Sequence, residues 1–292
     1  MNNYINCITH ASSEGNLLVG ENYTALIDCG MTFCAEKTIG KVKEALKGRA
    51  LDYIFFSHTH YDHIGALPFF RKEWPALQTL TTGIGAEVLL KATPRRVFRE
   101  LSIRAAETYC LPVDSIYSGS NYSDDVFRGD VIVKDGDSIP LGALTVEVLE
   151  TPGHTRDCLS FFIPELELLV SNETMGVLLP WGDVFPGFLS SYNETIKSME
   201  KCRNIPHKFL SLPHRGLVSQ GEMKSFFDKA LAQTSACREF ILGLKKKGLD
   251  ENEMLDSFYK EYSSRKLLEY QPEEAFMLNA RAAISCLMRE EL

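Results

Sequence analysis

The stretch "FFSHTHYDHIGALPFF", residues 55–70, contains three of the seven histidines of the chain. His58, His60, Asp62 and His63 form the pattern H-x-H-x-D-H within it. Imidazole and carboxylate groups are ligands that borderline divalent metals accept in proteins. In an extended chain, residues two apart point to the same side, so His58 and His60 can hold one ion together. Where the chain turns, Asp62 and His63 point elsewhere and can hold a second ion, so the pattern predicts a metal site.

An apolar segment comes directly before this motif. "LDYIFFS", residues 51–57, is rich in aromatic and branched side chains and predicts a buried strand. Apolar residues at helical spacing over 35–47, followed by Gly48, predict a helix before that strand. The motif therefore lies where a strand passes into a loop, and active sites of layered α/β proteins gather at such strand ends.

Three more candidate ligands follow apolar strands further along the chain. His154 comes after "LTVEVLE", Glu173 after "LELLV" and His214 after "KFLSL". Strand ends at one edge of a sheet converge in space. We therefore expect these three side chains to meet the H-x-H-x-D-H motif.

The rest of the pattern divides the chain in two. Two β-rich parts extend to residue 217, and a helical insertion over about 85–110 separates their strands, with Pro94 expected to split it into two helices. After residue 218 the apolar spacing is helical, and Asp250 with Glu253 forms a capping-box signature. We expect an α/β domain over 1–217 and a helical extension over 218–292.

Composition excludes several classes of protein. The 292 residues are 45% apolar and 24% charged, with a net charge of −8, which disfavours a nucleic-acid binder. No segment reaches the roughly 18 consecutive apolar residues of a spanning helix, and the N-terminus lacks the features of a signal peptide. The eight cysteines form no CxxC pair. We expect a cytoplasmic protein with neither nucleic acid nor membrane as a partner.

The order of these motifs resembles that of the metallo-β-lactamase superfamily. The resemblance covers residues from about 4 to 216. It implies an αββα sandwich with two divalent metal ions between the sheets, zinc or iron, with manganese as a further option. It also implies a ligand set of two groups and one bridging residue: His58, His60 and His154 for the first metal; Asp62, His63 and His214 for the second; Glu173 between them.

The resemblance further implies hydrolysis by a hydroxide formed from water between the two metals. Asp62 would be the catalytic residue that orients this water. The family normally has aspartate where this chain has Glu173, in the context "SNET". Glu173 either bridges the two ions or binds one of them, and we expect aspartate at this position to serve at least as well. Thr155 and Asp157 either fix a ligand imidazole or cap the turn after "PGH".

Two segments bear on the substrate. Residues 178–192, "LLPWGDVFPGFLSSY", carry the candidate substrate-binding residues Trp181, Phe185 and Phe188, which either line an apolar pocket or pack against the C-terminal helices. Four arginines of the insertion either meet an anionic carrier such as coenzyme A or form a solvated helix face, and we favour the solvated face. They are Arg95, Arg96, Arg99 and Arg104.

The insertion, the C-terminal helices and "HYDHIGALPFF" resemble the thioesterase-like branch of the superfamily, which includes quinolone-signal response proteins. This resemblance implies a hydrolase that cleaves a small-molecule acyl thioester linked to coenzyme A or another carrier, and it allows for a homodimer. Two alternatives stay open within the enzymes, a hydroxyacylglutathione hydrolase and a lactonase. A third is a weakly catalytic regulatory or ligand-binding protein with the same fold.

Overall fold

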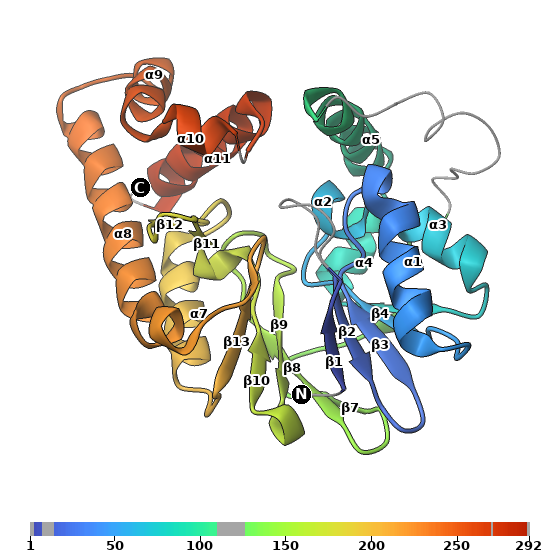
Figure 1. Cartoon of the computed structure of the whole chain (residues 1–292). Coiled ribbons are helices and arrows are strands. Elements are labelled where there is room, and N and C mark those ends of the chain that lie inside the picture. Colours follow the sequence, from blue (N-terminus) through green and yellow to red (C-terminus); the bar gives the residue numbers. More distant parts are fainter. Residues whose placement is uncertain (1–2, 8–14, 110–125, 270, 291–292) are drawn as a thin grey trace.

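A first six-stranded sheet places the H-x-H-x-D-H motif (Figure 1) in the computed structural model, which describes residues 3–7, 15–109, 126–269 and 271–290. The strand order is β1-β2-β3-β4-β5-β6. Strands β1 to β3 pair antiparallel and β3 to β6 pair parallel, so β3, β4 and β5 end at the same edge. The strands are β1 (Tyr4–Asn6), β2 (Asn16–Val19), β3 (Thr24–Ile27), β4 (Tyr53–Phe55), β5 (Gln78–Thr81) and β6 (Val131–Ile132).

A second six-stranded sheet has the order β14-β13-β10-β9-β8-β7. Strands β10 and β13 pair parallel, and β8 runs in the same direction because β9 is antiparallel to both β8 and β10. A 3-10 turn over Pro164–Leu166 connects the antiparallel strands β9 and β10. The strands are β7 (Ser138–Pro140), β8 (Thr145–Glu150), β9 (Leu159–Ile163), β10 (Leu168–Val170), β13 (Phe209–Leu212) and β14 (Gly216–Leu217), and a separate hairpin joins β11 (Val177–Leu178) to β12 (Val184–Phe185).

Helices cover the outer face of each sheet (Figure 1). In the first sheet Leu26 and Ile54 point outward into a cluster with residues of α1 and α3, while their neighbours Ile27 and Phe55 point inward toward the second sheet. The ring of Phe55 lies 5.4 Å from that of Phe161 in β9, centroid to centroid. Burial of both faces explains why β3 and β4 are mostly apolar. The predicted αββα metallo-β-lactamase fold is confirmed.

The helical insertion is two helices, as expected, but the break lies before Pro94. One helix ends at Leu90 and the next begins at Ala92, with Lys91 between them in extended conformation. Pro94 lies in the first turn of the second helix, where its missing N–H costs no hydrogen bond. The helices of the first half are α1 (Ala35–Leu46), α2 (Tyr61–Ile64), α3 (Leu67–Glu73), α4 (Gly83–Leu90) and α5 (Ala92–Thr108).

The C-terminal helices begin at strong caps. Ser219 with Glu222, and Asp250 with Glu253, each form a complete capping box. Phe226 of α8 packs with residues of α7 and of the second sheet, so this part of α8 covers the sandwich itself. The division into domains at residue 217 stays a prediction. The helices are α7 (Tyr192–Arg203), α8 (Gln220–Lys246), α9 (Glu251–Tyr262), α10 (Arg265–Leu268) and α11 (Glu273–Glu290).

In the described part of the chain, none of the helices combines the length and apolar character that crossing a membrane requires.

Candidate metal centre

The seven predicted ligands come together at one edge of the sandwich. His58 and His60 follow β4, and α2 carries Asp62 and His63. The other three side chains follow strands of the second sheet that run in one direction: His154 after β8, Glu173 in the 3-10 turn after β10, and His214 after β13. The backbone N–H of Leu159 donates to the carbonyl of Ser57 at 2.7 Å and joins the two sheets beside the site. The convergence expected from the strand ends is present.

The ligand atoms form two groups that share Glu173. The first is His58, His60, His154 and Glu173, and the second is Asp62, His63, His214 and Glu173. Within each group the ligand atoms all lie within 4.8 Å of one another. A set of imidazole and carboxylate donors at this density fits divalent metal ions.

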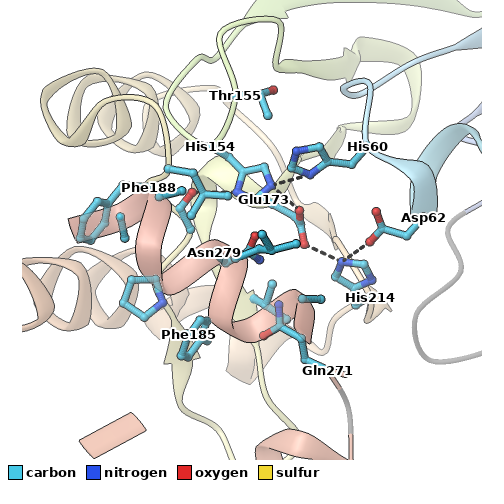
Figure 2. A pocket seen from close by; sticks show the side chains of 18 of the residues that line it. His60, Asp62, His154, Thr155, Glu173, Phe185, Phe188, His214, Gln271 and Asn279 are labelled. Carbon is cyan, nitrogen blue, oxygen red and sulfur yellow. Dashed lines mark hydrogen bonds and ion pairs between the residues drawn. The ribbon is translucent and has the colours of Figure 1, made fainter. Parts of the chain in front are cut away.

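Glu173 offers one carboxylate oxygen to each group (Figure 2). Its Oε2 lies 2.7 Å from Nε2 of His154 and 3.4 Å from Nε2 of His58. Its Oε1 lies 2.6 Å from Nε2 of His214, and Nε2 of His214 is 3.8 Å from Oδ2 of Asp62. The longer side chain therefore reaches both sides of the site.

Hydrogen bonds at Nδ1 orient the imidazoles of His154 and His58 with Nε2 toward the centre, whereas His60 turns its Nδ1 toward Nε2 of His154. Nδ1 of His154 donates to the carbonyl of Gly187 at 2.8 Å, and Nδ1 of His58 lies 3.1 Å from Oγ of Ser57. Nε2 of His58 and of His63 are buried and have no hydrogen-bond partner among the described residues. A buried polar nitrogen without a partner costs free energy, and a metal ion at the centre would satisfy it.

Asp28 is a residue of the site that the sequence does not single out by its spacing to the ligands. It follows β3 at the same sheet edge, is 3% exposed and has a left-handed backbone with φ of 58°. Its Oδ2 lies 2.9 Å from Nδ1 of His63, and its Oδ1 accepts the backbone N–H of Ser57 at 2.7 Å. A carboxylate in this place fixes the tautomer and orientation of a ligand imidazole. The available signal was an acidic residue ending an apolar strand, the same signal that singled out Glu173.

The pKa shifts of His58 and His60 are opposite in direction to that of His63. Burial lowers the pKa of His58 and of His60 well below the usual range, so both are neutral and able to bind metal. Burial also opposes the charged form of His63, but the carboxylates of Asp62 and Asp28 outweigh it and raise the pKa to about 10. The Asp62 side of the site thus attracts a cation, and a metal ion can replace that proton.

The carboxylates respond to the same surroundings. Burial raises the pKa of Glu173, but His154 and His214 outweigh it and hold that pKa well below the usual range. Burial raises the pKa of Asp62. An ionised Glu173 between two histidine groups is the arrangement that a shared ligand needs.

Asp157 supports the ligand loop, although through the backbone and not through an imidazole. Its side chain is buried and Oδ2 accepts the backbone N–H of Thr59 at 3.0 Å, between the first two ligands. Thr155 instead contacts Sγ of Cys158 through its hydroxyl, at 3.1 Å. Within the described residues, neither side chain is hydrogen-bonded to a ligand ring.

A cavity of about 870 Å3 opens onto the metal centre. Phe185 and Phe188 line it together with His60, His154 and Glu173 (Figure 2). Trp181 is not among the lining residues: it is 40% exposed, and the ammonium group of Lys266 lies 5.9 Å from its ring centroid. Of the three aromatic residues predicted for substrate binding, the structure brings two to the cavity.

The four arginines of the insertion do not line this cavity. Arg95 donates to the carbonyls of Leu89 and Phe127, which ties it to the backbone of its own layer. Arg96 pairs with Glu100 in the same helix, and Arg104 reaches Glu274 of α11 at 3.4 Å. The contacts of Arg96 and Arg104 fit a solvated helix face, whereas Arg95 packs against its own layer.

Comparisons with known proteins identify a family. The family model of the metallo-beta-lactamase superfamily matches residues 16–214. A probable metallo-hydrolase of Burkholderia pseudomallei is 28% identical over 134 residues, 46% of this chain and 38% of that protein. A hydroxyacylglutathione hydrolase of Bartonella henselae is 26% identical, over 64% of this chain and 56% of that protein. The chain therefore spans less than two thirds of the length of these two relatives.

Solved structures show the same fold over the whole chain. A metallo-beta-lactamase family protein of Thermus thermophilus superposes with a TM-score of 0.60 at 16% identity. The match covers 100% of this chain and 94% of that one, so it includes the C-terminal helices.

Proposed function

The chain belongs to the metallo-beta-lactamase superfamily, and from this premise we propose that it is a two-metal hydrolase of an acyl thioester. The observation that carries the proposal is Glu173, whose two carboxylate oxygens face two separate groups of histidine ligands. A shared carboxylate holds two ions close together, the arrangement used by two-metal hydrolases.

The roles of the residues follow from their positions. Divalent ions bound at this centre would supply Lewis acidity, which would lower the pKa of water and stabilise negative charge on an attacked carbonyl oxygen. His58, His60 and His154 would hold one ion, and Asp62, His63 and His214 the other. Asp62 is half-buried, faces the cavity and has a raised pKa, so it is placed to accept a proton from water and orient it.

Two considerations favour a thioester over other substrates. The relatives include hydroxyacylglutathione hydrolases, and a hydroxyacylglutathione is itself a thioester. The cavity beside the ligands is lined largely by apolar side chains, which suits an acyl group better than a phosphodiester. Two other candidates remain, a lactonase and a regulatory protein that has kept the fold. The experiment below tests both on the same protein preparation.

The test is release of free thiol from a panel of acyl-coenzyme A, acyl-glutathione and acyl-carrier-protein thioesters, with lactones run in parallel. We expect thiol release that a chelator abolishes and that added zinc, iron or manganese restores. Turnover of lactones alone would overturn the thioester proposal. Absence of any turnover by metal-loaded, folded protein would favour the regulatory protein.

A further inference from the structure

The cavity is larger than a short acyl group requires. Its volume of about 870 Å3 lies near the upper end of the roughly 300–1,000 Å3 found for small-molecule sites. A hydroxyacyl group of a few carbons fills a small part of this space and offers hydroxyl groups that need partners. The volume of the cavity and its lining residues therefore indicate which class of substrate it can hold.

Three segments far apart in the sequence build the walls. Helix α5 of the insertion, the segment from Phe185 in β12 to Phe188, and α11 of the C-terminal extension all contribute apolar side chains. In Figure 1, α5 and α11 face each other in the upper part of the molecule, above the two sheets. The residues from the two helices include Val97, Phe98, Leu101, Ala275, Ala282 and Ala283.

Aromatic packing holds the Phe185 wall in place, and an ion pair connects the α5 and α11 walls. The ring of Phe185 packs 5.9 Å from that of Phe276 and 6.3 Å from that of Tyr262, centroid to centroid. Arg104 of α5 reaches Glu274 of α11 at 3.4 Å and links the two helices directly. The space between the helices is thus bounded by packed side chains.

The shape is long as well as apolar. Ala275 and Ala283 both line the cavity and lie eight positions apart on one helix, which is about 12 Å along its axis. Small side chains along that face leave room for a chain that lies parallel to the helix. A wall of this length suits an extended hydrocarbon chain better than a single aromatic ring.

One polar side chain of α11, Asn279, lies between Ala275 and Ala283 and points toward the ligands. Asn279 projects from α11 into the cavity on the side of Glu173 and His214, whereas Phe185 and Phe188 lie away from Asp62 and His214 (Figure 2). A substrate with one polar end and one apolar end matches this division.

We propose that the cavity between α5 and α11 binds a medium-length aliphatic acyl chain, with its carbonyl end at the ligands. This proposal rests on the proposed function only in that the carbonyl group at the ligands belongs to a thioester. Free decanoate carries the same chain and has no bond to hydrolyse, so its binding can be measured without turnover.

The test is isothermal titration calorimetry of the full chain with decanoate, butanoate and benzoate, on metal-loaded and chelator-treated protein. Decanoate should bind at least about tenfold more tightly than butanoate or benzoate, because its additional methylenes are buried. Ala282→Phe, which fills the cavity from α11, should weaken decanoate binding at least tenfold and leave thermal unfolding unchanged. Ala92→Phe is the matched control, since Ala92 is exposed and does not line the cavity.

Ala275→Leu is a second variant, at the start of α11, in case Ala282→Phe does not fold. Decanoate binding no tighter than that of butanoate would overturn the proposal, and so would decanoate binding that is unchanged in both folded variants. Benzoate binding tighter than that of decanoate would also overturn it and would indicate an aromatic acyl group instead. Selective decanoate binding without thioester hydrolysis by the metal-loaded protein would support the cavity assignment and overturn the proposed function instead.

Discussion

A His60→Ala variant is expected to lose metal and hydrolytic activity together. His60 belongs to the first ligand group, and its Nδ1 lies 3.1 Å from Nε2 of His154. Substitution of residues that merely orient a ligand costs about 10–100-fold in metal affinity or activity, so loss of a ligand should cost more than about 100-fold. The measurement is metal per chain by elemental analysis, with thioester hydrolysis on the same preparation.

His207→Ala is the matched control. His207 is remote from both ligand groups, and its Nδ1 donates to the carbonyl of Ile205 at 2.7 Å. This variant should keep its metal and its activity. If His60→Ala retained full metal and full turnover with an unchanged unfolding temperature, the assignment of the H-x-H-x-D-H motif to a metal centre would be wrong.

A Glu173→Asp variant is expected to lose about one metal ion per chain. Removing one methylene withdraws the carboxylate by about 1.5 Å, and its two oxygens then cannot reach Nε2 of His154 and Nε2 of His214 at once. The sequence led to the opposite expectation, because aspartate is the residue that the resemblance supplies. In the structure, the backbone around Glu173 is fixed, so a shorter aspartate side chain could not be compensated by a shift of the turn.

That backbone has little freedom to compensate. The 3-10 turn of Glu173 is capped by Asn172, which is fully buried and donates to the hydroxyls of Thr151 and Ser160. Gly187 packs so closely that a Cβ built there would overlap the carbonyl oxygen of Glu173. A shift of the turn toward the ligands would break these contacts.

Glu200→Asp on the exposed face of α7 is the control for the same chemical change. It should leave the metal content untouched. Metal content and activity in Glu173→Asp equal to those of the unaltered protein would show that aspartate spans the two groups equally well, and that the length of Glu173 has no role.

Much of the site was predictable because its residues follow a simple geometric rule. Parallel strands end at one edge of a sheet, so a polar residue directly after an apolar strand marks that edge. His58, His154, Glu173 and His214 all stand in such places. The fold followed from the same strands, because both faces of each sheet are covered and most of the strand residues are therefore apolar.

The remaining features depend on contacts between distant segments. Asp28 carried the same signal as Glu173, but its role depends on a hydrogen bond to His63, 35 residues away in sequence. The cavity needs α5 and α11 to face each other, and no local pattern encodes that pairing. Trp181 lies in the turn between β11 and β12 and Phe188 follows β12, yet of the two only Phe188 lines the cavity.

Metal content of the unaltered protein tests the central claim most directly. The protein is purified without chelator and without added metal, and metal per chain is determined by elemental analysis. A bridging Glu173 predicts close to two divalent ions per chain, one for each ligand group. One ion or none in folded protein, not raised by incubation with zinc, iron or manganese, would contradict a two-metal hydrolase.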